Sequence, residues 1–219
     1  MLLRPFPRVP HLSGSGVGPG DLLLSPDFEA RLFGRRLVVS EKLDGINVAV
    51  GVRADGRPLF EVRERWRDAL GGGVVRALDL YLRQRERDLA AVLRPGWTLY
   101  GEWLWHRLTV TYDRLPDLFV VLAVVDRRGR CLPFAPARRT LERAGFATPP
   151  VVWRGRLAHR RALTAQVGRS RYGRGRMEGV VVELPGEPDP RRRFAKWVRP
   201  SYVAPTVGVL DGRRNRLAR

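Results

Sequence analysis

Residues 37–50 read Leu-Val-Val-Ser-Glu-Lys-Leu-Asp-Gly-Ile-Asn-Val-Ala-Val, with two apolar runs on either side of a short polar stretch. Apolar runs rich in valine and isoleucine predict strands, and the Asp44-Gly45 pair between them indicates a turn. Only two of the 41 lysine and arginine residues are lysines, Lys42 and Lys196. An arginine keeps its proton, whereas a lysine amine can lose one and attack an electrophile. Lys42 is therefore a candidate nucleophile, with chance placement as the alternative.

The charge of the chain predicts a polyanionic partner. The 219 residues suit one large domain or two small ones, and a hydrophobic content of 44% is ordinary for a packed core. The formal charge of +19 is extreme. A surplus of this size attracts nucleic acid through the release of counterions. Nucleotide bias of the source genome would explain arginine in place of lysine, but not the shortage of acidic residues.

Several classes of protein are excluded by what the sequence lacks. Cys131 is the single cysteine, which rules out an intramolecular disulfide framework and a multi-cysteine zinc site. The histidines, His11, His106 and His159, are too scattered for a metal-binding spacing. The first residues do not resemble a signal peptide, and no apolar run is long enough to span a bilayer. We therefore expect a soluble cytoplasmic protein without a membrane or an evident protein partner.

The periodicity of apolar residues predicts one mixed domain of helices and mostly antiparallel strands. Residues 1–20, rich in proline and glycine, are expected to form an irregular surface loop. Asp55-Gly56 between two apolar runs predicts a hairpin. Helices are expected at 27–33, 74–93, 135–144 and 158–167. Strands are expected at 37–39, 46–50, 59–62, 98–102, 118–125, 151–153, 178–184 and 193–198.

Charged residues that interrupt apolar strands mark a candidate site, because a charge among apolar neighbours costs free energy unless something binds it. The carboxylates of this kind are Asp44, Glu102 and Glu178, and the cations are Arg63 and Lys196. Carboxylates and cations at strand ends suit a nucleotide with its metal ion. Each residue taken singly is also compatible with a turn or a structural salt bridge.

The ordered set of these residues resembles the covalent nucleotidyltransferase superfamily, and most closely its ATP-dependent RNA ligase branch. The resemblance rests on Lys42-Leu43-Asp44-Gly45, Arg63, Tyr100-Gly101-Glu102, Phe119, Glu178-Gly179-Val180-Val181 and Lys196. It implies an α+β nucleotidyltransferase fold, an ATP-grasp-like ligase adenylation domain whose mainly antiparallel sheets are flanked by helices. With few residues after Lys196, we expect residues 1–219 to be this single domain without an appended OB-fold domain.

The resemblance also implies a role for each matching residue. Lys42 would take AMP onto its amine, with Asp44 orienting and activating it. Glu178 would serve the metal ion and the reacting phosphate, and Lys196 would neutralise the α-phosphate and the pyrophosphate leaving group. Nearby cations would lower the pKa of Lys42. Glu102 would bind the ribose, and Phe119 would stack on the purine. Glu41, Gly45 and Arg63 would supply the remaining nucleotide contacts, with Arg65 as the alternative to Arg63.

The sequence departs from the pattern of the family in two respects. Ala123 stands where the family commonly has an acidic residue. Phe194 and Val198 flank Lys196 where a second lysine is usual, which leaves Arg193 or Arg199 to supply the charge.

The implied activity is the sealing of RNA ends, in which a 5′-phosphate is joined to a 3′-hydroxyl. The implied cofactors are ATP and Mg²⁺, and Mn²⁺ could replace Mg²⁺. A minimal DNA ligase, a capping guanylyltransferase and a noncatalytic basic nucleic-acid-binding protein are the alternatives.

Overall fold

A computed structural model describes residues 3–63, 66, 71–204 and 212–218. The helices are α1 (Pro26–Leu32), α3 (Gly72–Gln84), α4 (Glu86–Val92), α5 (Phe134–Arg143), α6 (Arg160–Thr164) and α7 (Pro190–Arg193). The strands are β1 (Arg36–Lys42), β2 (Ile46–Val52), β3 (Pro58–Val62), β4 (Thr98–Trp103), β5 (Phe119–Val125), β6 (Val151–Arg156), β7 (Gly179–Glu183) and β8 (Phe194–Val198). No helix among these described residues is long and apolar enough to cross a membrane.

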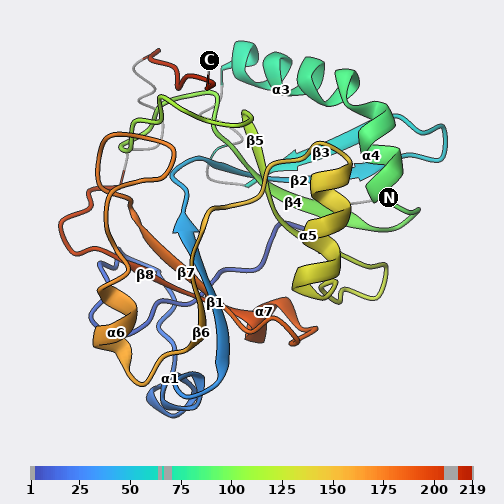
Figure 1. Cartoon of the computed structure of the whole chain (residues 1–219). Helices are drawn as coiled ribbons and strands as arrows, with labels where there is room; N and C mark the ends of the chain where they lie inside the picture. The colour runs from blue at the N-terminus through green and yellow to red at the C-terminus, as the bar shows by residue number, and fades with distance from the viewer. Residues whose placement is uncertain (1–2, 64–65, 67–70, 205–211, 219) are drawn as a thin grey trace.

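The strands form two antiparallel sheets, which confirms the expected α+β class. The first sheet has the order β6-β1-β7-β8 and the second has the order β3-β2-β4-β5 (Figure 1). The strands β1 and β2 are separated in sequence only by residues 43–45, yet they belong to different sheets. The turn after Lys42 therefore passes the chain from one sheet to the other.

Alternation of side chains along each strand creates three layers of apolar packing. On β2, Ile46, Val48 and Val50 face α3, α4 and α5. On β1, Leu37 and Val39 face α1 and α6 in a second cluster. Figure 1 shows these two groups of helices on opposite outer sides of the sheets. The inner faces enclose a third cluster that includes Ala49 of β2, Tyr100 of β4 and Phe194 of β8.

The N-terminal segment differs from the expected surface loop. It is irregular, as predicted, but Leu3, Phe6 and Val9 pack between the inner faces of the sheets. The ring centroid of Phe6 lies 4.9 Å from that of Tyr100 and 5.5 Å from that of Phe194. The segment thus forms one wall of the space between the sheets.

Other differences concern helix boundaries. The helix expected over 74–93 is divided into α3 and α4 at Arg85, whose backbone φ of −104° and ψ of 15° leave the helical region. Its guanidinium lies 3.0 Å from Asp117 and donates to the carbonyl of Gly145, so partners distant in sequence fix the break. The helix expected over 158–167 is shorter than predicted, and α7 lies in a segment for which no helix was predicted.

Candidate active site

A cavity of about 990 Å³ opens between the two sheets. This volume is within the range of ligand pockets and is large enough for a nucleoside triphosphate. Lys42 and Lys196 reach it from the first sheet, and Asn47 and Glu102 reach it from the second. The structure therefore brings together polar residues that are separated by up to 154 positions in the sequence.

Lys42 forms an ion pair with Glu178 inside this cavity. The amine lies 2.7 Å from each carboxylate oxygen of Glu178. The cross-strand pairing of Lys42 with Gly179 explains the contact, because it holds the end of β1 beside the start of β7. Gly179 is required there, since a Cβ atom at this position would lie 2.0 Å from the carbonyl oxygen of Trp197.

The carboxylates around Lys42 set its protonation in the free protein. Burial alone would lower the pKa of Lys42, but Glu178, Glu102 and Asp44 together raise it above its ordinary value. The expectation that nearby cations lower the pKa of Lys42 is therefore wrong, because the surrounding carboxylates have the larger effect. Burial in turn raises the pKa of Glu178. Lys42 is held as an ammonium ion until this pair is opened.

Glu102 and Gly45 are in direct contact. The amide of Gly45 donates to Oε1 of Glu102 over 3.2 Å, and Glu102 is paired with Asn47 across β4 and β2. A Cβ atom on Gly45 would lie 2.5 Å from Leu104 and 2.8 Å from Glu102. The absence of a side chain at Gly45 therefore lets the turn after Lys42 pass close to Glu102 and Leu104.

The carboxylate of Asp44 accepts three hydrogen bonds. Its Oδ2 accepts from the amides of Thr109, over 2.8 Å, and Val110, over 2.6 Å. Its Oδ1 accepts from the hydroxyl of Tyr202 over 2.7 Å, and its own amide donates to the hydroxyl of Tyr112. This carboxylate fixes the turn after Lys42 and links it to the loop after β4 and the chain after β8.

Glu41 faces the opposite side of β1 from Lys42, as alternation along a strand requires. Its carboxylate accepts from the hydroxyl of Ser170 over 2.6 Å and from the amide of Arg171 over 2.9 Å. Burial raises the pKa of Glu41, partly offset by these two bonds. The carboxylate of Glu41 anchors the loop at 169–176, and Glu41 also lines the cavity, so the nucleotide contact predicted for this residue stays a prediction.

The stacking role predicted for Phe119 is wrong. Phe119 pairs with Trp103 across β5 and β4, so its side chain lies on the helix-facing side of the sheet, whereas Glu102 lies on the cavity side. The side chain of Phe119 is 0% exposed. A Cβ atom on Gly101 would lie 2.3 Å from its ring, which shows that Gly101 leaves room for Phe119 in the core.

Lys196 and Arg63 place further positive charge in the cavity. Burial and the nearby Lys42 lower the pKa of Lys196 to about 8. Its amine lies 4.0 Å from Asp21, whose other oxygen lies 3.2 Å from Nε2 of His11. Arg63 lines the same cavity and contributes to the lowered pKa of Lys196.

The two arginines considered as a second charge beside Lys196 have other partners. Arg193 is buried, and its Nε lies 2.7 Å from Glu183. Arg199 donates to the carbonyl of Met177 and to the hydroxyl of Ser201. Arg65, the competitor of Arg63, lies outside the described residues.

Sequence reasoning missed several residues of the site. Asn47, His11 and Asp21 line the cavity, and Tyr202 and Tyr112 hold the turn at Asp44. Asn47 is a polar residue within the apolar run of β2, and a criterion that included uncharged polar residues would have found it. His11 and Asp21 carried no such signal, because both lie in irregular segments.

The family model described as RNA ligase matches residues 35–198. A comparison with curated protein sequences finds no significant match. Among solved structures, the fold is similar to that of an RNA ligase from Naegleria gruberi in several forms. One is a lysine-to-alanine variant with ATP and Mn, at a TM-score of 0.56 and 15% identity, covering 92% of this chain and 63% of that one.

Two further structures of the Naegleria gruberi RNA ligase are similar in fold to this chain. A glutamate-to-alanine variant with AMP and Mn matches at a TM-score of 0.56 and 15% identity, with 91% of this chain and 62% of that chain covered. The structure with PPi matches at a TM-score of 0.55 and 18% identity, with coverages of 92% and 59%. This chain therefore spans less than two thirds of the length of these Naegleria gruberi structures.

Proposed function

The chain belongs to the RNA ligase family, and from this premise we propose that it is an ATP-dependent RNA ligase joining a 5′-phosphate to a 3′-hydroxyl. The observation that carries the proposal is the convergence of Lys42, Glu102, Glu178 and Lys196 from two sheets in one cavity. A sealing activity of this kind suits the repair of broken RNA.

In the first step, the neutral amine of Lys42 attacks the α-phosphorus of ATP. A bond forms between the lysine nitrogen and phosphorus, the bond from phosphorus to the bridging oxygen breaks, and pyrophosphate leaves. The ammonium ion must lose a proton before it attacks, and Glu178, 2.7 Å away, is the group positioned to accept it. Lys42 therefore becomes a nucleophile only when its ion pair with Glu178 has opened.

The remaining polar residues would bind and orient the nucleotide. Lys196 and Arg63 would offset the negative charge of the phosphates, where charge increases on the leaving group. Glu102 would accept hydrogen bonds from the ribose hydroxyls, and Gly45 would keep its carboxylate in place through the amide contact. Asp44 orients Lys42 through the turn that both residues share.

A divalent cation fits the donor set of this cavity. Mg²⁺ and Mn²⁺ prefer oxygen ligands, and Mg²⁺ is commonly held by one or two carboxylates together with substrate phosphates and water. Glu178 is buried at the cavity and could supply a carboxylate, while the described residues contain no cluster of three or more acidic, histidine or cysteine ligands. When bound, Mg²⁺ would stabilise negative charge on the reacting phosphate.

The later steps move AMP from the protein to RNA. The 5′-phosphate of RNA attacks the phosphorus of the lysine adenylate, and the amine of Lys42 leaves. The 3′-hydroxyl of the second end then attacks the 5′-phosphorus, AMP leaves, and a phosphodiester bond is formed. Each step exchanges one bond at phosphorus for another and needs no further reactant.

Labelling with ATP tests the proposal. We expect transfer of AMP from α-labelled ATP to the protein in Mg²⁺ or Mn²⁺, and loss of this transfer when the metal is removed with EDTA. Lys42→Ala should abolish labelling, and so should Lys42→Arg, which keeps the ion pair with Glu178 but cannot become a nucleophile. Labelling that survives in both variants would exclude Lys42. A chase with 5′-phosphorylated RNA should remove the label.

The same assay separates the alternatives. A chase that releases AMP with nicked DNA but not with RNA of the same sequence would indicate a DNA ligase. Preferential labelling by GTP would indicate a guanylyltransferase. Salt-sensitive RNA binding without labelling by either nucleotide would indicate a noncatalytic nucleic-acid-binding protein.

A further inference from the structure

Exposed arginines gather on the two segments that flank residues 111–115. On one side, the amides of Asp113 and Arg114 donate to the carbonyl of Tyr172, in the loop of residues 169–176. On the other side, the amide of Leu115 donates to the carbonyl of Arg216. We call the exposed arginines of these flanking segments the arginine ridge: Arg169, Arg171, Arg174, Arg176, Arg214 and Arg216.

The ridge has little negative charge to balance it. Asp113 is the only carboxylate that forms an ion pair with a ridge arginine among the described residues, and its partner Arg174 is still 90% exposed. Arg169 and Arg176 lie opposite one another in an antiparallel bridge. Like charges in this arrangement repel, so the folded protein bears a cost that a bound polyanion would remove.

The ridge is attached to the candidate active site on both sides of Lys42. Glu41 binds Ser170 and the amide of Arg171 and so fixes the loop at 169–176. Asp44 binds the amides of Thr109 and Val110, at the start of the strip that continues to residue 115. Two carboxylates within two residues of the lysine thus hold the ridge at a fixed position relative to the cavity.

The segment that carries Arg214 and Arg216 is also firmly held. The side chain of Asn215 is buried, donates to the carbonyls of Leu104 and His106, and accepts from the amide of Tyr112. The guanidinium of Arg214 lies 4.2 Å from the ring centroid of Trp105. The arginines on this side of the ridge therefore project from a backbone that internal bonds keep in place.

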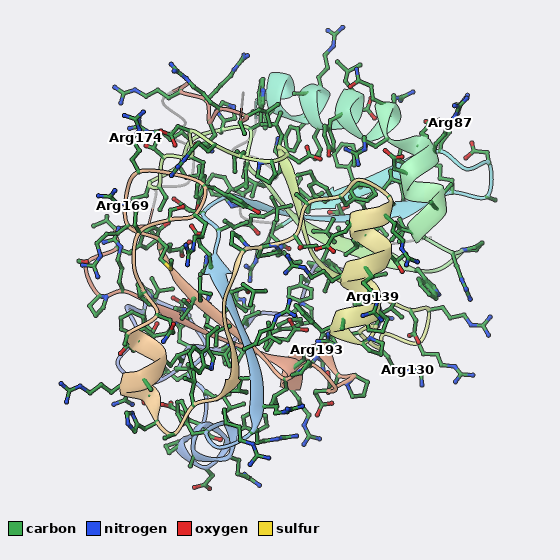
Figure 2. The ribbon with its side chains drawn as sticks, in the orientation of Figure 1. Arg87, Arg130, Arg139, Arg169, Arg174 and Arg193 are labelled. Carbon is green, nitrogen blue, oxygen red and sulfur yellow. The ribbon has the colours of Figure 1, made fainter. Side chains whose placement is uncertain are left out.

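We propose that the arginine ridge binds the phosphodiester backbone of the RNA whose end is sealed at Lys42. The choice of RNA rests on the proposed function, and the choice of the backbone rests on the excess of guanidinium groups, which pair with phosphate oxygens. Figure 2 shows Arg169 and Arg174 on one side of the molecule, with Arg87 and Arg139 on the other. The opposite side therefore supplies matched control arginines.

The test compares two triple variants that remove the same number of charges. Arg171→Ala/Arg174→Ala/Arg176→Ala alters the ridge, and Arg87→Ala/Arg139→Ala/Arg143→Ala alters exposed arginines of α4 and α5. RNA affinity is measured by fluorescence anisotropy of a labelled 5′-phosphorylated strand, without ATP, over a range of salt concentrations. Arg214→Ala/Arg216→Ala tests the second side of the ridge in the same way.

We expect the ridge triple variant to bind RNA at least about tenfold more weakly in low salt, and the slope of log affinity against log salt to fall by about 2. The control triple variant should change affinity by less than about threefold. Equal losses in the two variants would show a general charge effect and overturn the proposal. Unchanged RNA affinity in the ridge variant would also overturn it, and would leave an acidic protein as the partner for this surface.

Transfer of AMP from ATP to the protein, which involves no RNA, distinguishes this proposal from the proposed function. The ridge variants should still be labelled, which also shows that they are folded. If the unaltered protein is not labelled but the ridge variant loses RNA affinity, the ligase proposal fails, and the arginine ridge stands only as an RNA-binding surface. If labelling occurs but the ridge variant binds RNA normally, the ridge proposal fails alone.

Discussion

The amine of Lys42 lies 2.7 Å from both carboxylate oxygens of Glu178, so the candidate nucleophile is held as a cation in the free protein. Lys196 lines the same cavity and has the opposite environment, because burial and the charge of Lys42 lower its pKa to about 8. The side chains are similarly exposed, at 22% for Lys42 and 18% for Lys196. A difference in their reactivity therefore reports protonation rather than access.

Acetylation at pH 8 should modify Lys196 at least about tenfold faster than Lys42. Only a neutral amine reacts, and a group is mostly protonated below its pKa. Labelling of Lys196 should level off above about pH 9, whereas labelling of Lys42 should still rise above pH 10. Chymotryptic peptides quantified by mass spectrometry give the two rates, and the amine of Met1 is resolved as a separate peptide. Equal rates at pH 8 would contradict the assigned charge states.

Glu178→Gln should separate the effect on the pKa of Lys42 from the effect on chemistry. Removing this carboxylate removes the largest influence that raises the pKa of Lys42, so acetylation of Lys42 at pH 8 should become faster. Labelling by ATP should nevertheless fall by at least about a hundredfold, because the variant lacks a carboxylate for the metal ion and the proton. The control is Glu183→Gln, which removes a different carboxylate of β7. Glu183 is buried and forms an ion pair with Arg193. Faster labelling by ATP in Glu178→Gln would contradict the role of Glu178 in binding the metal ion and accepting the proton.

Most elements of the fold could be predicted from the sequence, because the strands are short apolar runs bounded by turn residues. The β2–β3 hairpin follows from Asp55-Gly56, and Gly56 has the positive φ of 82° that such a turn requires. The division between the two sheets could not be predicted, since nothing local indicates that the chain leaves one sheet at Lys42 and enters another at Ile46. The division of the predicted helix at Arg85 could not be predicted either, because the partners of Arg85, Asp117 and Gly145, are distant in sequence.

The candidate site was predicted well where a charge interrupts an apolar strand, and poorly where the prediction depended on which face a side chain occupies. Lys42, Glu102 and Lys196 all lie on cavity faces. The carboxylate of Glu41 binds the loop at 169–176 and the ring of Phe119 lies in the core, and only contacts with distant segments of the chain reveal this. A residue one position away from a catalytic residue on a strand is directed to the other side of the sheet.

Phe119 should matter for stability and not for ATP. Its ring is fully buried against Gly101, Trp103 and Tyr81 on the side of the sheet away from the cavity. Phe119→Ala should lower the free energy of unfolding by about 3–5 kcal/mol. Phe119→Leu should cost less and remain folded, so that its KM for ATP can be measured in the labelling reaction. A KM within about twofold of the unaltered protein is expected, and a tenfold rise would restore the stacking role.

Tyr202→Phe should slow the reaction of Lys42 without preventing nucleotide binding. The hydroxyl of Tyr202 donates to Oδ1 of Asp44, while the amides of Thr109 and Val110 hold Oδ2. Removal of one donor to a carboxylate costs about 1–2 kcal/mol and leaves the turn that carries Lys42 less firmly fixed. The rate of labelling by ATP should fall by about fivefold to tenfold, with KM for ATP nearly unchanged.

Tyr81→Phe is the matched control for Tyr202→Phe, because the hydroxyl of Tyr81 donates to Asp117 on the outer side of the second sheet. Urea unfolding should show comparable losses of stability in the two variants, since each loses one hydrogen bond to a carboxylate. Only Tyr202→Phe should lose labelling rate if Asp44 positions Lys42 through its hydrogen bonds. Equal rates in both variants would mean that the backbone amides alone fix Asp44, and that the chain after β8 does not contribute to the position of the nucleophile.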